Sequence, residues 1–366
     1  MKRDRFFWLQ LATPFIAILF AFVIGAIIVM AIGKNPLSVF GTMVAFSFGK
    51  VDSLGLILFR ATPYIFTGLG VAIGFQLGLF NIGAESQYKI GLFVAAVVGY
   101  SFPGLPAIIH IPLTIIAGII GGMLWGLLPI YLKLNRGVHE VISTIMLNHT
   151  ATSLLHYLLT GPFLDQNQTG ATQRIMRTRF FAESARIPTV HGLTDLLHIP
   201  LPNYVHLNYM FFIGIALCVV VYWLIWKTPF GYELRAVAGN RTAAEAAGIN
   251  VKKIMFFAFM LSAGIAGMAG LSEAMTMYGY MSVDFPGGYG LTGIAVALLG
   301  KNNPFGVILS ALLFGFLERG AQGIQVLAGV PSEVITILQG VIILSVVVAY
   351  SLLSRYIRIQ KKKEAA

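Results

Sequence analysis

The sequence predicts an all-α polytopic membrane protein, with about ten transmembrane elements in two halves of inverted topology and broken helices near the midplane. Hydrophobic residues make up 57% of the 366 residues and charged residues 11%, whereas ordinary soluble chains carry about 25% charged residues. Long apolar runs recur at close to the ~20 residues that a membrane helix needs. The 40 glycines favour close packing between such helices. Residues 1–366 are therefore expected to form a single transmembrane domain.

The lengths of the apolar runs define the elements. The basic N-terminus resembles the start of a signal peptide, but the run at 11–32 lacks a small-residue cleavage site, so we expect a retained helix. The run at 289–300 has about half the required length and is expected to be broken or re-entrant. The elements are 11–32, 54–74, 84–100, 111–132 and 138–159 in a first half of about 11–160, and 207–226, 254–275, 289–300, 304–325 and 333–353 in a second half of about 207–353.

The basic residues orient the chain. The formal net charge is +11, which in a soluble protein would indicate nucleic acid. Here 16 of the 25 Lys and Arg fall at the termini and in the loops that share a side with them. Because short cytoplasmic loops carry the excess of positive charge, we expect a multi-pass protein of the bacterial cytoplasmic (inner) membrane with both termini in the cytoplasm.

Three segments between the runs are polar or amphipathic. The segment 161–205 is rich in Thr, Arg, Gln, His and Pro, is expected outside, and is too long for a simple connector. Residues 34–53 are amphipathic and indicate an interfacial helix. The longest cytoplasmic loop is 227–253. The outer segment and the cytoplasmic loop are both candidates for docking a partner.

The stretch from Gly74 to Gly91 interrupts the apolar pattern with glycines, Asn81, two glutamines and Glu85. Irregular backbone at membrane depth is tolerated where protein or a water-filled cavity surrounds it, and such interruptions indicate a transport pathway. A charged residue in a membrane segment also needs a reason. The alternative is a plain loop whose glycines let helices approach each other.

A short internal repeat supports two related halves. Gly137 begins G-V-H-E-V-I-S-T-I-M-L and Gly329 begins G-V-P-S-E-V-I-T-I-L, each at the fifth element of its half. Five elements per half give the second copy the opposite polarity in the membrane. The glycine-rich element 287–300 then corresponds to 74–91. Chance similarity between apolar segments is the alternative explanation.

Motifs for enzymatic chemistry are missing from the sequence. Lys301 follows Gly300, but Ala295 and Asn302 occupy positions at which a nucleotide-binding P-loop needs Gly and Ser or Thr. His139 and Glu140 do not continue into a zinc motif. His149 and His156, seven residues apart, are interpreted as packed or hydrogen-bonded core. We expect no catalytic residue, no metal site and no cofactor in this chain.

The cytoplasmic loop contains a short docking helix. Asn240 or Thr242 can cap a helix over 243–247, and Gly248 can end it in the left-handed conformation. Small alanines would let this helix enter a groove of a partner. A solvated connector helix is the alternative.

Four motifs together resemble the permease subunits of ATP-binding-cassette (ABC) importers of the branched-chain amino acid, ribose and nucleoside group, and most closely the nucleoside or simple-sugar type. They are L-F-N-I-G-A-E-S-Q at 79–87, G-V-H-E-V-I-S-T-I-M-L-N at 137–148, A-G-N-R-T-A-A-E-A-A-G-I-N at 238–250 and G-L-T-G-I-A-V-A-L-L-G-K-N-N-P-F-G at 290–306. Ser86 departs from the glycine that is usual in that group.

The resemblance implies a coupling element for an ATPase and a substrate pathway. Glu85 has two possible roles, in the pathway or as a cap on the amides of the next helix. Asn81 and Gln87 could bind hydroxyls or base edges, and Phe80 and Tyr289 could stack. The pathway candidates are Phe80, Asn81, Glu85, Gln87, Asn148, Tyr289 and Thr292, and the coupling candidates are Gly239, Asn240, Arg241, Ala243, Ala244, Ala247, Gly248 and Ile249.

The resemblance also implies the partners and the mechanism. We expect a second permease, identical or paralogous, two cytoplasmic ATPase subunits or one fused ATPase that binds ATP and Mg²⁺, an extracytoplasmic binding protein and surrounding lipid, without nucleic acid. ATP binding would move the coupling helix and rock the permeases between two access states, with nucleosides as the favoured cargo. The alternatives are an ABC permease for sugars or branched-chain amino acids, and an ion-coupled secondary transporter that uses Glu85 and Glu140.

Overall fold

A computed structural model describes residues 2–168, 175–196, 198, 201–285, 287–331, 333–342, 344–345 and 348, with the backbone alone for 2–15 and 17. Every regular element in these ranges is a helix. The chain divides into two compact units: unit 1 is Met1–Ile57 with Leu313–Ala366, and unit 2 is Leu58–Leu312. The all-α prediction is confirmed for the described residues.

Unit 1 contains α1 (Lys2–Ala31), α2 (Pro36–Phe48), the start of α3 (Val51–Gln76), the end of α14 (Pro304–Ala328) and a short helix at 333–342. The Asn35 side chain ends the turn after α1 by accepting the Leu37 amide at 3.0 Å, and the chain bends by 117° there. The helix predicted within 34–53 is α2. Arg319 on α14 lies over the Phe46 ring at 4.1 Å, so aromatic and cationic contacts hold α2 against α14.

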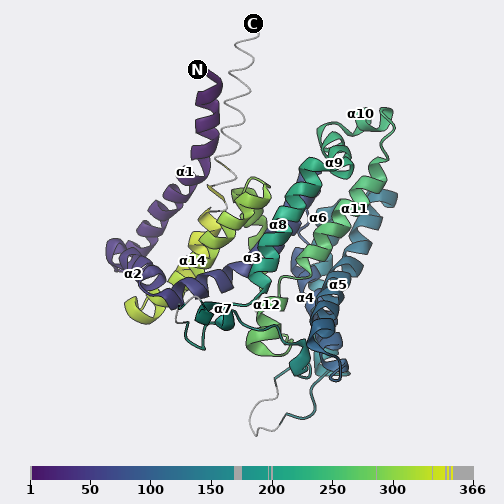
Figure 1. Cartoon of the computed structure of the whole chain (residues 1–366). Coiled ribbons are helices and arrows are strands. Elements are labelled where there is room, and N and C mark those ends of the chain that lie inside the picture. The colour runs from purple at the N-terminus through teal and green to yellow at the C-terminus, as the bar shows by residue number, and fades with distance from the viewer. Residues whose placement is uncertain are drawn as a thin grey trace. The chain divides into compact units, whose positions relative to one another are not determined.

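Unit 2 is a helical bundle, and its members are drawn in Figure 1. They are the rest of α3, α4 (Ala84–Ser101), α5 (Ala107–Arg136), α6 (Glu140–Thr160), α7 (His191–Leu196), α8 (Met210–Lys227), α9 (Pro229–Gly239), α10 (Arg241–Ala246), α11 (Val251–Ala266), α12 (Leu271–Glu273), α13 (Tyr289–Leu299) and the start of α14, with 3₁₀ and π turns at Glu183–Ala185 and Ala274–Tyr278.

Glycines set the distances inside the bundle. At Gly91 on α4, an added Cβ would lie 2.6 Å from the Gly118 carbonyl of α5 and 2.7 Å from the Gly267 carbonyl after α11. Any larger residue would push these three helices apart, because real Cβ atoms do not approach a carbonyl oxygen so closely. The high glycine content therefore has the packing role that the composition predicts.

A helix lies at each of the ten predicted elements, although not all of them are clear membrane spans. Within the described residues, five helices are long and apolar enough to cross a membrane: Val51–Gln76, Ala107–Arg136, Met210–Lys227, Val251–Tyr278 and Pro304–Ala328; α1 with α2 can add a sixth. α13 has 11 residues, which agrees with the expectation of a short element at 289–300. α6 has 21 residues but is not among the apolar five.

The described part of segment 161–205 folds onto one end of unit 2. The Thr178 amide donates to the Met281 carbonyl at 2.9 Å and the Phe181 amide to the Gly279 carbonyl at 2.7 Å. Asp165 pairs with Arg177 at 3.1 Å. The opposite end of the bundle carries α9 and α10 (Figure 1). Unit 2 thus has two distinct ends, each with a candidate docking element.

Candidate functional site

The predicted interruption within 74–91 is a break between α3 and α4. Residues 77–83 are not helical, and Gly78 has a φ of +66°, which glycine adopts without strain. The amides of Leu77 and Leu79 both donate to the Gly74 carbonyl at 3.0 Å. The backbone therefore supplies part of its own hydrogen bonding where the helix stops, as the membrane interior demands.

Asn81 in the break and Gln87 in α4 are hydrogen-bonded to each other through their side-chain amides. The Asn81 Nδ2 donates to Gln87 Oε1 at 2.8 Å, and the Gln87 Nε2 donates to Asn81 Oδ1 at 3.0 Å. Asn81 also donates to Ser262 Oγ of α11 at 2.9 Å. Both amide side chains are almost completely buried. In this conformation their amides hold the break to α4 and α11.

Asn148 of α6 holds the break from another side. Its Nδ2 donates to the Ile82 carbonyl and its Oδ1 accepts the Ser86 amide, each at 3.1 Å. The Ser86 hydroxyl donates to the Gly83 carbonyl at 3.0 Å. Serine is thus accommodated at the position where the resemblance leads one to expect glycine.

Glu85 caps a helix, but it caps α13 and not its own helix. Its two carboxylate oxygens accept the amides of Gly288 and Gly290, each at 2.9 Å. The carboxylate also pairs with Lys89 at 3.1 Å. A carboxylate is stabilised at a helix N-terminus by the free N–H groups and the helix dipole. Hydrogen bonds therefore join the two elements, 74–91 and 287–300, that the internal repeat predicts to be equivalent.

Tyr289 begins α13 and lies in a buried aromatic cluster. Its ring contacts Tyr64 and Tyr88 at centroid distances of 5.5 and 5.7 Å, and its hydroxyl donates to Glu273 Oε2 at 2.7 Å. Thr292, one turn further on, is half-buried and its amide donates to the Gly288 carbonyl. The structure thus gives the Tyr289 ring neighbours within the chain.

Glu273 and Arg60 are functional candidates that the sequence reasoning missed. The fully buried Glu273 carboxylate accepts from Arg60 Nη1 at 3.0 Å and lies beside the π turn at Ala274–Tyr278. A charged pair inside a membrane bundle is costly and marks a site of importance. In the sequence, Arg60 and Glu273 are each a single charged residue within an apolar run. That isolated charge was the signal by which either residue could have been found.

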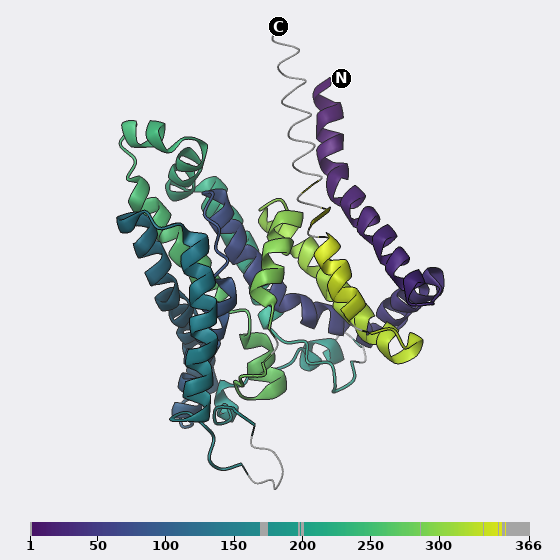
Figure 2. The same ribbon diagram turned by 180° about the vertical axis from the view of Figure 1, so that it is seen from behind.

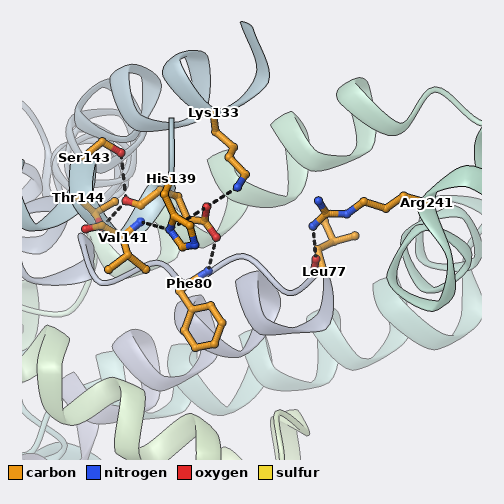
Figure 3. Close-up of polar contacts among 9 residues, drawn as sticks. Leu77, Phe80, Lys133, His139, Val141, Ser143, Thr144 and Arg241 are labelled. Carbon is orange, nitrogen blue, oxygen red and sulfur yellow. Dashed lines mark hydrogen bonds and ion pairs between the residues drawn. The ribbon is translucent and has the colours of Figure 1, made fainter. Parts of the chain in front are cut away.

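The middle of the break is tied to the start of α6 (Figure 3). The Phe80 amide donates to Glu140 Oε1 at 3.3 Å, and Glu140 Oε2 pairs with Lys133 Nζ at 2.7 Å. The Phe80 ring contacts Phe75 at 4.9 Å and is half exposed. The Glu140 carboxylate is therefore used in a structural ion pair that joins α5, α6 and the break.

The other break follows α13. Lys301 and Asn302 have φ values of +57° and +54°, and the Gln76 side chain at the end of α3 donates to the Asn302 carbonyl at 2.9 Å. Burial lowers the pKa of Lys301. The last residue of α3, next to the first break, is therefore hydrogen-bonded to the second break.

The short helix expected over 243–247 is present as α10 (Arg241–Ala246), and its docking role stays a prediction. Asn240 caps it by accepting the Ala243 amide at 3.1 Å, and Gly248 follows it with a φ of +85°. Most of its side chains are exposed, whereas Ala244 is buried. Figure 3 shows Arg241 reaching the break, where its Nη2 donates to the Leu77 carbonyl at 3.2 Å. Gly239, Ala247 and Ile249 complete the element, with Ile249 half-buried and its amide bonded to the Ala244 carbonyl.

One interpretation from the sequence is wrong. His149 and His156 are exposed on α6 and not packed in a core. The i, i+7 spacing places both on one helix face, but it does not say whether that face is inward. Among the described residues, no cluster of three or more His, Cys, Asp or Glu could hold a metal ion.

Over the described residues, an all-helical fold with apolar helices, broken helices and the exposed short helix α10 is the arrangement expected of a membrane permease subunit. Residues 53–347 match the family model described as branched-chain amino acid transport system / permease component. The chain belongs to this permease family. No solved structure matches it.

Curated relatives match almost the whole chain. It is 37% identical over 359 residues to the guanosine ABC transporter permease protein NupP of Bacillus subtilis, covering 98% of both chains. It is 33% identical to the nucleoside ABC transporter permease protein NupB of Lactococcus lactis, covering 93% of this chain and 92% of that one. It is 32% identical to the glucose ABC transporter permease protein TsgB13 of Haloferax volcanii, covering 92% and 87%.

Replacing Asn81 by leucine is expected to reduce the amount of folded protein. The change leaves the Gln87 amide and the Ser262 hydroxyl without their partner, at about 1–3 kcal/mol for each buried group. The amount of membrane-inserted protein that survives detergent extraction and heating measures the loss. Asn81→Leu with Gln87→Leu removes both amides and should recover part of it. A stable Asn81→Leu protein whose transport alone is lost would instead make Asn81 a substrate contact.

Proposed function

We propose that this chain is the permease subunit of an ATP-driven ABC importer that moves nucleosides by alternating access. The observation that carries the proposal is the match over nearly the full length to NupP and NupB, whose names specify guanosine and nucleoside. The exposed helix α10 supports ATPase coupling. The similar match to a glucose permease leaves sugar as the second candidate cargo.

A paralogous second permease fits the relatives best. The chain is 26% identical to NupQ of B. subtilis, also named a guanosine ABC transporter permease, and 30% identical to NupC of L. lactis, also named a nucleoside permease. These matches cover about 70% of the chain, against 98% for NupP. We infer that this chain is the longer member of a heterodimer that also binds cytoplasmic ATPases and an extracytoplasmic binding protein.

We further propose ten membrane elements in inverted halves, with the termini and α10 in the cytoplasm. The repeated G-V sequences support this, because Gly137 and Gly329 have φ values of +68° and +59°. The following valine amides, Val138 and Val330, donate to the carbonyl six residues earlier in each case. A membrane-impermeant maleimide should label Asp195→Cys in intact cells and Glu245→Cys only in opened cells; the reverse pattern would invert the topology.

A series of contacts in unit 2 could transmit a movement of α10 to the break between α3 and α4. An ATPase that moves α10 would also move Arg241, which is bonded to the Leu77 carbonyl in the break. The break is bonded through Phe80 to the ion pair of Glu140 and Lys133. Closure of the ATPases can therefore reposition the break that lies between α3 and α4.

Uptake by a reconstituted transporter tests the function. The chain is combined with its partner permease, ATPase and binding protein, and ATP turnover and uptake are measured with guanosine, glucose and leucine. We expect guanosine to be accumulated and to raise ATP turnover through the loaded binding protein. Stimulation by glucose or leucine alone would reassign the cargo, and uptake without ATP would favour a secondary transporter.

A further inference from the structure

The exposed face of α6 differs from the exposed faces of the other long helices. On α5 the exposed large side chains include Ile109, Ile116, Ile120 and Leu124, and on α8 they include Val220 and Trp223, as lipid requires. On the outer half of α6 the exposed residues are instead mostly polar, with Leu154 as the aliphatic exception. The polar ones are His149, Thr150, Thr152, Ser153, His156 and Thr160, with Tyr157 among them.

These polar residues form a continuous stripe. His149, Ser153, His156 and Thr160 follow one another at intervals of four, three and four residues, so they lie on one side of the helix. Figure 2, which shows unit 2 from behind, has α6 on the near surface of the bundle. The cytoplasmic end of the same stripe is Met146, which is apolar and exposed. The polar character is thus confined to the middle and outer part of the helix.

The polar groups of the stripe retain hydrogen-bonding capacity. Within the described residues, the side chains of His149, Ser153 and His156 make no hydrogen bond. The Thr150, Thr152 and Thr160 hydroxyls donate within the helix, to the Met146, Asn148 and His156 carbonyls respectively, and keep their acceptor lone pairs. Unpaired imidazole and hydroxyl groups in hydrocarbon are costly. Their environment must therefore supply hydrogen bonds.

The inner side and one edge of α6 border the candidate pathway residues. Asn148 beside His149 holds the α3–α4 break through Ile82 and Ser86. Thr152 lines a small pocket with Lys89, Ser282 and Phe285. Movement of the break would therefore shift the stripe. This connection favours a functional cavity over a static contact with a second helix.

We propose that the stripe His149–Ser153–His156 of α6 lines the aqueous pathway and hydrogen-bonds the sugar hydroxyls and base edges of a nucleoside in transit. The inference rests on the proposed function. Neutral imidazole offers one donor and one acceptor, and its ring can stack on a base. Seven residues of helix separate the two imidazoles by about 10 Å along the axis, so one cargo molecule can be passed from one to the other.

Thiol labelling of the assembled transporter tests the surface. In a Cys218→Ser background, His149→Cys, Ser153→Cys and His156→Cys should react with a small water-soluble methanethiosulfonate, whereas Ile120→Cys on the apolar face of α5 should not. Guanosine, presented on its binding protein with ATP, should slow the three reactions. Unreactive cysteines would show a face sealed by the second permease and would overturn the proposal.

Transport variants separate this proposal from the proposed function. His149→Leu and His156→Leu should lower guanosine uptake per assembled complex by about two- to tenfold, and His149→Gln and His156→Gln should recover part of it. Uptake unchanged in both leucine variants, or labelling that guanosine does not slow, would overturn substrate contact. If the unaltered complex does not take up guanosine, the proposed function fails, but labelling still decides whether the stripe faces water.

Discussion

Replacing Ala247 by arginine is expected to abolish the stimulation of ATP turnover by the loaded binding protein. Ala247 ends α10 and is exposed, as is Ala243 one turn earlier. A long charged side chain at either position would prevent a close fit into an ATPase groove and would be costly to bury. A loss of docking affinity of tenfold corresponds to ~1.4 kcal/mol, and a buried unpaired charge exceeds this.

The burial of Ala244 decides which variants are informative. Ala244 is buried within unit 2. Arginine at this position would therefore disrupt the packing of α10 against the rest of the unit. Exposed substitutions usually change stability by less than about 0.5 kcal/mol, so Ala243→Arg and Ala247→Arg should leave the permease folded.

ATP turnover with and without loaded binding protein, in proteoliposomes, gives the readout. Ala107→Arg is the matched control, because Ala107 is an exposed alanine at the start of α5, at the opposite end of unit 2. Normal stimulation in both α10 variants would show that the ATPase docks elsewhere.

Secondary structure could be predicted because local rules decide it. The cap at Asn240, the left-handed Gly248 and the break around Gly78 each follow from the preferences of one or two residues. The apolar runs predicted a helix in each of ten ranges, and described residues in every one of these ranges are helical. This prediction was possible because the thickness of the membrane sets the length of an apolar run. The inference that Glu85 is a cap was also possible from its position in the sequence.

Tertiary partners could not be predicted in the same way. The helix that Glu85 caps begins at Tyr289, about two hundred residues further on, and sequence spacing does not contain this information. The pairing of Arg60 with Glu273 could not be predicted for the same reason, because the two residues are far apart in the sequence. Whether His149 and His156 face inward depends on how α6 is rotated in the bundle. A period of seven residues gives a face but not its direction.

Replacing Glu85 by leucine is expected to prevent assembly of the transporter. The change leaves the Gly288 and Gly290 amides without an acceptor, and each lost buried hydrogen bond costs about 1–3 kcal/mol. It also removes the charge that stabilises the N-terminus of α13. Glu85→Gln keeps one acceptor oxygen and should be less damaging.

The pairing with Lys89 allows the capping role to be separated from a charge role. If Glu85 acted mainly as the partner of Lys89, Glu85→Leu with Lys89→Leu would restore assembly. If it caps α13, the double variant stays defective and Lys89→Leu alone is mild. The amount of complex purified through the ATPase, and guanosine uptake per complex, are measured for all four variants. Normal assembly of Glu85→Leu with loss of uptake alone would contradict the cap and place Glu85 in the pathway.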